Sequence, residues 1–173
     1  MEQPVFKRVL LKISGEALAG DKHFGLDFQV MGRVADVIKQ CVDMGVQVGI
    51  VIGGGNFWRG VKDGEGHIER TRADHMGMLA TAMNCMAMAD VLEQKGVDVR
   101  VQTALEIRAV AEPYIRARAI RHLEKGRGVI FGRFSPRIPR RYCVRRRSTR
   151  TSSCWPRTST ACTTATRPRT PTR

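Results

Sequence analysis

The last 41 residues of the chain, the C-terminal segment (133–173), contain no aspartate, glutamate or lysine but twelve arginines. The preceding body (1–132) holds all 16 acidic residues together with 18 lysines and arginines. The body therefore carries a charge of only +2, and the C-terminal segment supplies +12 of the total of +14. A charge of +14 spread over a whole chain would suggest a nucleic-acid-binding protein, and this distribution argues against that class for the body.

The chain also lacks long apolar runs and paired cysteines. No apolar run reaches the length of a membrane-spanning helix, and the N-terminus lacks the basic-then-apolar pattern of a signal peptide, so we expect a cytoplasmic protein. Cys41 and Cys85 lie in helical patterns and the other three cysteines lie in the C-terminal segment. Their spacing matches no metal-ligand motif, so the sequence predicts free thiols and no protein metal site.

The body contains two apolar, strand-like runs that end in small residues. Val48–Ile52 leads into Gly53-Gly54-Gly55-Asn56, and Arg8–Ile13 leads into Ser14-Gly15-Glu16. Glycine has no Cβ, so its backbone N–H groups can closely approach phosphate oxygens, although plain tight turns would show the same pattern. With Lys12 beside the first turn, the two runs predict a nucleotide phosphate site at the carboxyl ends of parallel strands.

Strand-like and helix-like patterns alternate along the body, which predicts an α/β fold with a parallel sheet and helices on both faces. Asp27 is expected to cap the first helix. The expected strands are Arg8–Ile13, Val46–Ile52, Val97–Thr103 and Gly128–Phe131; the expected helices are Phe28–Met44, Asp74–Lys95 and Glu112–Glu124; and the expected loops are Ala17–Gly25 and Val61–Gly66.

Several residues have two readings from pattern alone. Lys12 is a phosphate ligand or an edge-strand lysine that extends to solvent, and Arg59 is a phosphate clamp or a solvated loop residue. Asp74 and His75 form an acid–base pair, or else Asp74 caps a helix whose first turn contains His75. The methionines of the second helix favour packing in a core or subunit interface over an adaptable binding surface: Met76, Met78, Met83, Met86 and Met88.

Three motifs together resemble the N-terminal motifs of bacterial UMP kinases, the uridylate kinases of the amino-acid kinase superfamily. They are Lys7-Arg8-Val9-Leu10-Leu11-Lys12-Ile13-Ser14-Gly15-Glu16-Ala17-Leu18, Val51-Ile52-Gly53-Gly54-Gly55-Asn56-Phe57-Trp58-Arg59-Gly60 and Ala73-Asp74-His75-Met76-Gly77-Met78-Leu79-Ala80-Thr81. The resemblance covers residues 5–132. It implies a three-layer sandwich with a mainly parallel sheet, and reversible transfer of the γ-phosphoryl group of ATP to UMP in pyrimidine nucleotide biosynthesis.

The resemblance also implies site residues. Lys12 and Arg59 would be catalytic, ATP would bind Lys12, Ile13, Ser14, Gly15, Gly55 and Arg59, and UMP would bind Gly54 and Asp74. The region implied for allosteric activation by GTP is Gly20, Asp21, Lys22, His23, Phe24 and Gly25. Mg²⁺ would accompany ATP, UTP would inhibit, and the intact protein would be a homohexamer.

From residue 133 the sequence departs from that pattern. The glycine-rich UMP loop and the later ATP-side segment expected of the family are missing, and the segment instead has the composition of a disordered basic tail. However, permitted codons for Tyr142–Ser152, regrouped by one base, encode Leu-Arg-Ala-Ala-Glu-Ile-Asp-Ala-Asp-Val, which matches the missing family sequence. This favours an out-of-frame translation that begins after a short deletion near Gly132.

These observations predict two parts: residues 1–132, the N-terminal part of an amino-acid kinase domain, and residues 133–173, a disordered frameshifted tail. We expect the chain as written to be inactive, because it lacks the loop that would hold UMP. The alternative function is nucleic-acid binding through Arg140, Arg141 and Arg145–Arg147, but stacking aromatic residues are scarce there.

Overall fold

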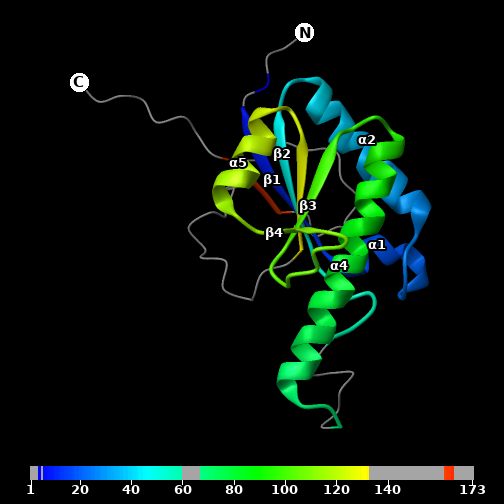
Figure 1. Cartoon of the computed structure of the whole chain (residues 1–173). Coiled ribbons are helices and arrows are strands. Elements are labelled where there is room, and N and C mark those ends of the chain that lie inside the picture. The colour runs from blue at the N-terminus through cyan, green and yellow to red at the C-terminus, as the bar shows by residue number, and fades with distance from the viewer. Residues whose placement is uncertain (1–3, 5, 60–66, 133–161, 166–173) are drawn as a thin grey trace, which may run out of the picture.

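The computed structural model describes residues 4, 6–59, 67–132 and 162–165, and its centre is a twisted sheet (Figure 1). The strands are β1 (Arg8–Ile13), β2 (Gln47–Ile52), β3 (Val99–Thr103), β4 (Glu112–Pro113), β5 (Gly128–Gly132) and β6 (Cys162–Ala165). Their order across the sheet is β4-β3-β5-β2-β1-β6. All pairings among β1 to β5 are parallel, whereas β6 pairs antiparallel with β1.

Helices cover both faces of the sheet. They are α1 (Gly15–Ala19), the short 3₁₀ helix η1 (Gly20–Lys22), α2 (Phe28–Asp43), α4 (Arg70–Gln94) and α5 (Arg116–Glu124). Helices α1, α2 and α4 contribute to the main core on one face, and α5 covers the opposite face. The predicted α/β sandwich with a mainly parallel sheet is therefore confirmed.

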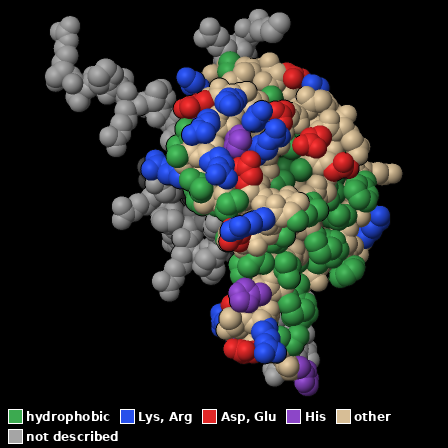
Figure 2. Space-filling model, viewed as in Figure 1, with side chains coloured by type: hydrophobic (Ala, Val, Ile, Leu, Met, Phe, Trp, Pro, Cys, Tyr) green, Lys and Arg blue, Asp and Glu red, His purple; other side chains and the backbone are tan. Residues whose placement is uncertain are grey.

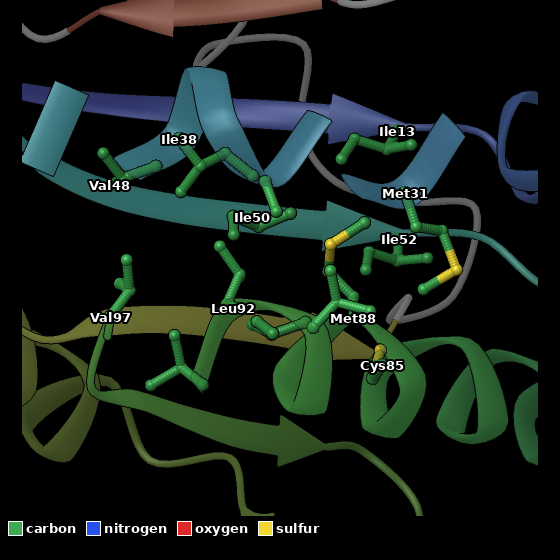
Figure 3. Packing of buried hydrophobic residues seen from close by; sticks show 14 of the residues in the cluster. Ile13, Met31, Ile38, Val48, Ile50, Ile52, Cys85, Met88, Leu92 and Val97 are labelled. Atoms are coloured by element: carbon green, nitrogen blue, oxygen red, sulfur yellow. The ribbon is translucent and has the colours of Figure 1, made fainter. Parts of the chain in front are cut away.

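The main core fills the space between the sheet and the helices α2 and α4 (Figure 3). Val48, Ile50 and Ile52 alternate along β2, so all three side chains point toward this face. Met31 and Leu92 approach them from α2 and α4, and neither is exposed. Burying a side chain of this size contributes about 1.5–3 kcal/mol, so this layer holds the carboxyl ends of the strands firmly in place.

The smaller core lies under α5. Ala119 and Leu123 of α5 pack on Val129 of β5, with Phe131 beside them. Ile130, between these two β5 residues, points to the main core instead. The near-continuous apolar run of β5 is explained by burial on both faces.

The structure differs most from the sequence-based expectation at three places. The expected loop Ala17–Gly25 includes the last residues of α1 and all of η1. Helix α1 forms because Ser14 caps it by accepting a hydrogen bond from the amide of Ala17 and because Leu18 and Ala19 are buried. Helix α4 begins at Arg70, four residues before the expected start. The expected third helix begins only at Arg116, since Glu112–Pro113 pair with the end of β3 as β4.

The expectation that residues 133–173 lack fixed structure does not hold at Cys162–Ala165, which form β6 on the outer edge of β1. A strand there satisfies backbone groups of β1 that would otherwise remain unpaired, and threonine has a high strand propensity. The other residues of that segment, including the arginines of the nucleic-acid hypothesis, lie outside the described residues. Within the described ranges, no helix is both long enough and apolar enough to span a membrane.

Candidate active site

The turns that follow β1 and β2 lie against each other at the carboxyl edge of the sheet. The amide of Gly53 donates a hydrogen bond of 3.1 Å to the carbonyl of Ile13, which extends the β1–β2 pairing into the turns. A Cβ built on Gly15 would lie 2.7 Å from both the Gly53 carbonyl oxygen and the Gly55 nitrogen. Backbone therefore touches backbone here, and only glycine fits at position 15 without displacing the second turn.

Two buried asparagines hold the second turn in shape. Asn56 and Asn84 exchange side-chain hydrogen bonds of 3.0 and 2.7 Å, and their residues are 2% and 0% exposed. The amide of Asn84 also donates to the Gly53 carbonyl at 2.6 Å, and that of Asn56 donates to the Gly25 carbonyl at 2.6 Å. This network connects the turn to α4 and to the segment after η1, so the glycine turn is rigidly supported rather than a free loop.

Neighbouring glycines of this turn face different elements. A Cβ on Gly54 would lie 2.8 Å from the Thr81 nitrogen and 2.9 Å from the Gly77 carbonyl oxygen, both in the backbone of α4. A Cβ on Gly55 would instead approach only the side chain of Glu16, at 3.7 Å, on the α1 side. The peptide between Gly54 and Gly55 thus separates an α4 side of the site from an α1 side.

Arg59 lies on the α1 side of the turn. Its guanidinium forms an ion pair of 3.0 Å with Glu16, and its Nε donates a hydrogen bond of 3.2 Å to the Gly55 carbonyl. The Arg59 and Glu16 side chains are 45% and 60% exposed, so solvent or a ligand can reach both. An arginine held in this way beside a glycine turn can exchange its carboxylate partner for a phosphate.

Lys12 is exposed, and its place in β1 is opposite Val51 of β2. Its neighbours Leu11 and Ile13 contact the main core, so the Lys12 side chain points to the other face of the sheet. Because β1 has partners on both sides, β2 and β6, the edge-strand reading of Lys12 is wrong. Among the described residues its ammonium makes no hydrogen bond or ion pair, which leaves it available to an anion.

Asp74 and His75 lie inside α4, so the reading of Asp74 as a helix cap is wrong: the cap position belongs to Glu69. Consecutive helical residues point in directions about 100° apart, so Asp74 and His75 do not face each other as an acid–base pair. Asp74 is exposed and follows Ala73, whose carbonyl accepts a hydrogen bond of 2.9 Å from the Trp58 indole.

Asp74 lies on the same face of α4 as Thr81, whose backbone contacts Gly54. Thr81 lies seven residues, or about two turns, after Asp74 on the same side of α4. This face continues into the main core through Cys85, Met88 and Leu92. Asp74 therefore lies on the face of α4 that carries Thr81, about two helical turns from the contact with Gly54.

Comparison with known proteins gives the family. Residues 7–141 match the model of the amino acid kinase family. The chain belongs to this family. The match continues nine residues beyond Gly132, where the resemblance judged from the sequence ends, into residues outside the described part.

Two solved structures resemble this amino acid kinase chain. UMP kinase from Bacillus anthracis shares 45% sequence identity at a TM-score of 0.69, over 73% of this chain and 52% of that one. UMP kinase from Ureaplasma parvum shares 31% identity at a TM-score of 0.67, over 73% of this chain and 55% of that one. The chain therefore spans about half the length of these UMP kinases.

In this amino acid kinase, the segment expected to respond to GTP, Gly20–Gly25, is joined to the site. The Gly25 amide donates a hydrogen bond of 3.2 Å to the Asn56 carbonyl, and the rings of Phe24 and Phe57 meet edge to face at 5.7 Å. His23 has a left-handed backbone conformation with φ of 60°, which a histidine adopts less readily than glycine. The segment thus contacts the glycine turn directly, although its regulatory role stays a prediction.

The donor groups near the turns do not form a protein cage for a metal ion. Among the described residues, no group of three histidine, cysteine or acidic side chains could hold one. The acidic group nearest Gly55 is Glu16, which is paired with Arg59. Mg²⁺ often keeps several waters and binds chiefly through substrate phosphates, so backbone amides with Lys12 and Arg59 fit a metal that arrives with a nucleotide.

Sequence reasoning missed Asn84, Thr81 and Thr103 at this site. The methyl group of Thr103 lies 3.0 Å, and that of Thr81 3.6 Å, from where a Cβ on Gly132 would be, so the ends of β3 and β5 meet α4 there. The position of Asn84 was the signal that could have identified it. An asparagine next to Cys85, on the buried side of a long helix, needs polar partners inside the fold.

Proposed function

We propose that this chain forms the phosphate-binding half of a UMP kinase, which transfers the γ-phosphoryl group of ATP to UMP and yields ADP and UDP. The observation that carries the proposal is the pair of glycines with different neighbours, Gly54 toward α4 and Gly55 toward α1. A kinase needs two phosphorylated ligands to meet end to end, and a single rigid turn between the α1 side and the α4 side suits that requirement.

On the α1 side, the proposal assigns ATP to Lys12, Ile13, Ser14, Gly15, Gly55 and Arg59. Arg59 would exchange its ion pair with Glu16 for a phosphate, and Lys12 would add a second positive charge. On the α4 side it assigns UMP to Gly54 and Asp74. The carboxylate would accept hydrogen bonds from the nucleoside, since a carboxylate repels phosphate.

In the reaction, an oxygen of the UMP phosphate attacks the γ-phosphorus of ATP while the bond to the β–γ bridging oxygen breaks. Negative charge grows on the leaving ADP and spreads over the transferring oxygens. Lys12 and Arg59 stabilise that charge, and the amides of the glycine turns keep donor and acceptor in line. The enzyme forms no covalent intermediate, and Mg²⁺ bound to the ATP phosphates supplies further charge neutralisation.

The proposal extends to the family context of pyrimidine nucleotide biosynthesis in the cytoplasm, with a homohexameric enzyme, activation by GTP and inhibition by UTP. The contact of Gly25 with Asn56 supports a route by which GTP at Gly20–Gly25 would act on the turn. No observation on the described residues favours the nucleic-acid-binding alternative.

We further propose that residues 133–173 are an out-of-frame replacement of the family's UMP loop and that the chain as written is inactive. The test is a coupled ADP-release assay with UMP and Mg-ATP on two proteins, the 173-residue chain and a version with the deletion and reading frame restored. We expect activity only in the restored protein, because positioning supplies up to about 7–11 kcal/mol of the barrier reduction.

In the restored protein, Lys12→Ala, Arg59→Ala and Asp74→Ala should each remove most of the activity. Lys39→Ala is the matched control, because within the described part of the chain Lys39 pairs only with Asp43, on the surface of α2. UDP formation by the unrestored chain would contradict the second proposal. A restored enzyme that ignores UMP would contradict the first.

A further inference from the structure

Strand β6 lies on the outer edge of β1 and comes from the C-terminal segment (133–173), the part of the chain that departs from the family pattern. The two strands are antiparallel, and Val9, Leu10, Leu11 and Lys12 lie opposite Ala165, Thr164, Thr163 and Cys162, in that order. Without β6, strand β1 would be paired on one side only, with β2. An unpaired edge of this kind is a surface on which an extended segment can add a strand.

The hydrogen bonds between β1 and β2 show which backbone groups of β1 face outward. The carbonyls of Lys7 and Ile13 accept hydrogen bonds of 2.9 and 3.1 Å from amides at the start of β2 and just after its end. Because successive residues of a strand turn their N–H and C=O groups to opposite sides, the odd-numbered residues of β1 face β2. Leu10 and Lys12 therefore carry the N–H and C=O groups that face β6.

The same alternation identifies the groups of β6 that face β1. Leu10–Thr164 and Lys12–Cys162 are the hydrogen-bonded pairs of this register, in which each residue both donates to its partner and accepts from it. Thr163 lies between them, so its N–H points to the outer side of β6, where the sheet of the described residues ends. The Lys12–Cys162 pair comes just before the turn that follows β1, so β6 supports this strand up to the candidate phosphate site.

The composition of the C-terminal segment explains why this stretch forms the strand. Residues 158–166 are its longest run without arginine or proline, and β6 lies inside this run. Proline cannot donate to a strand ladder, and threonine favours strands. Figure 2 shows lysines and arginines interspersed with acidic side chains around α5, so this visible face offers the arginines of the segment no continuous acidic surface. Backbone pairing rather than charge therefore fits the segment to the sheet.

The same chain can supply the strand. Gly132 ends β5 at the carboxyl edge of the sheet, and Cys162 lies opposite Lys12 at the same edge. Three strand spacings, about 14–15 Å, separate β5 from β6. The 29 residues between Gly132 and Cys162 can extend over several times this distance, so the connection reaches without strain.

We propose that the outer edge of β1 is a strand-docking surface and that residues 162–165 of the same chain occupy it. The docked strand holds the backbone of Lys12 from its outer side and closes the edge against pairing with other chains. This role rests on the backbone register and not on the proposed kinase function. An inactive chain can keep β6 in place, and an active chain can lack it, so the two proposals fail separately.

The experiment is amide hydrogen exchange of the 173-residue chain, resolved by residue with NMR, with circular dichroism to verify the fold of each variant. The amides of Leu10 and Lys12 should be protected in the original chain. Thr164→Pro removes the N–H that faces Leu10 and places the proline ring against β1, so both amides should exchange about tenfold faster or more. The amides of Leu11 and Ile13 face β2 and should change by less than about threefold.

Thr163→Pro is the matched control, because it inserts the same residue one position away but removes an N–H that faces the outer side of β6. It should leave exchange at Leu10 and Lys12 within about threefold of the original. Repeating the measurement at a higher protein concentration identifies the source of the strand, since a strand from the same chain protects equally at both. Unprotected Leu10 and Lys12 amides in the original chain, equal effects of the two prolines, or protection that rises with concentration would each overturn the proposal.

Discussion

Replacing Asn84 with alanine tests whether the asparagine pair fixes the glycine turn. Asn84 makes three hydrogen bonds of 2.6 to 3.0 Å, two with Asn56 and one with the Gly53 carbonyl, and it is fully buried. Asn84→Ala removes all three and leaves the side-chain oxygen of Asn56 without a partner in a space that is closed to water.

The expected cost is about 2–4 kcal/mol, because each buried hydrogen bond contributes about 1 kcal/mol and an unpaired buried polar atom costs about 1–3 kcal/mol. This is a large part of the roughly 5–15 kcal/mol by which a domain is stable. Asn56→Ala should cost a similar amount. The double variant Asn56→Ala/Asn84→Ala should cost about 1–2 kcal/mol less than the sum, since neither side chain is then left without its partner.

The assay is urea unfolding followed by circular dichroism, with the free energy of unfolding compared among the four proteins. Gln94→Ala is the control: its amide also donates a hydrogen bond within α4, to Asp90 at 2.7 Å, but on the surface. It should change stability by less than about 0.5 kcal/mol. Additive costs in the double variant, or an Asn84→Ala cost no larger than that of the control, would refute the reasoning.

Three further predictions concern other parts of the fold. Gly15→Ala should lower the free energy of unfolding by about 1–3 kcal/mol, because the new Cβ would lie 2.7 Å from backbone atoms of the second turn. Gly32→Ala in α2, where the Cβ would meet open space, should instead raise it by about 0.5–1 kcal/mol. Equal effects of the two variants in thermal unfolding would contradict the backbone contact. Burial alone would raise the pKa of Glu112, but hydrogen bonds from Gln102 and His122 and the charges of His122 and Arg118 lower it below 4.5. Glu112→Gln should therefore lower the free energy of unfolding at pH 7, and this difference from the original chain should vanish as the pH falls through the pKa of Glu112 in the folded state. A difference that persists in acid unfolding curves would argue against this. Burial raises the pKa of the Cys85 thiol to about 12. Iodoacetamide at pH 8 should therefore modify Cys41 well before Cys85 in the folded chain, as measured by peptide mass spectrometry. Equal labelling of both cysteines would mean that α4 opens readily.

The order of the central elements could be predicted because each depends on local signals. β1 (Arg8–Ile13) has the expected bounds, and α2 begins at Phe28 with Asp27 accepting hydrogen bonds from the amides of Gln29 and Val30, as a cap should. Runs of β-branched residues and a capping aspartate act within a few positions of the chain, so pattern alone identifies them.

The remaining elements depend on contacts that are distant in sequence. Glu112–Pro113 is a strand only because β3 lies beside it, and the short run has no strand period of its own. Ser14 looked like part of a phosphate turn, yet it also caps α1, whose five residues are too few for a visible helical period. Helix α4 begins before Asp74, where the sequence offers no capping side chain.

The glycine turns of the site could be predicted from the sequence, but the residues that hold these turns in place could not. The glycine turns were predicted to lie at the carboxyl ends of parallel strands, and Gly15 and Gly55 do meet there. Asn84 and Thr81 could not be assigned, because nothing in the sequence tells which turn faces a given residue of a helix packed on the sheet. Their role depends on α4 crossing the end of β2, a relation that only the assembled fold defines.

The peptide between Gly54 and Gly55 sets the spacing between the two sides of the site. Consecutive Cα atoms are about 3.8 Å apart across a trans peptide, so the offset between the α4 side and the α1 side is a covalent length rather than the sum of adjustable side-chain contacts. Substitutions around the site can change how tightly each ligand is held, but they leave this interval unchanged. Only an insertion or deletion within Gly53–Asn56 could alter it, and the Asn56–Asn84 pair holds the far end of that stretch against α4.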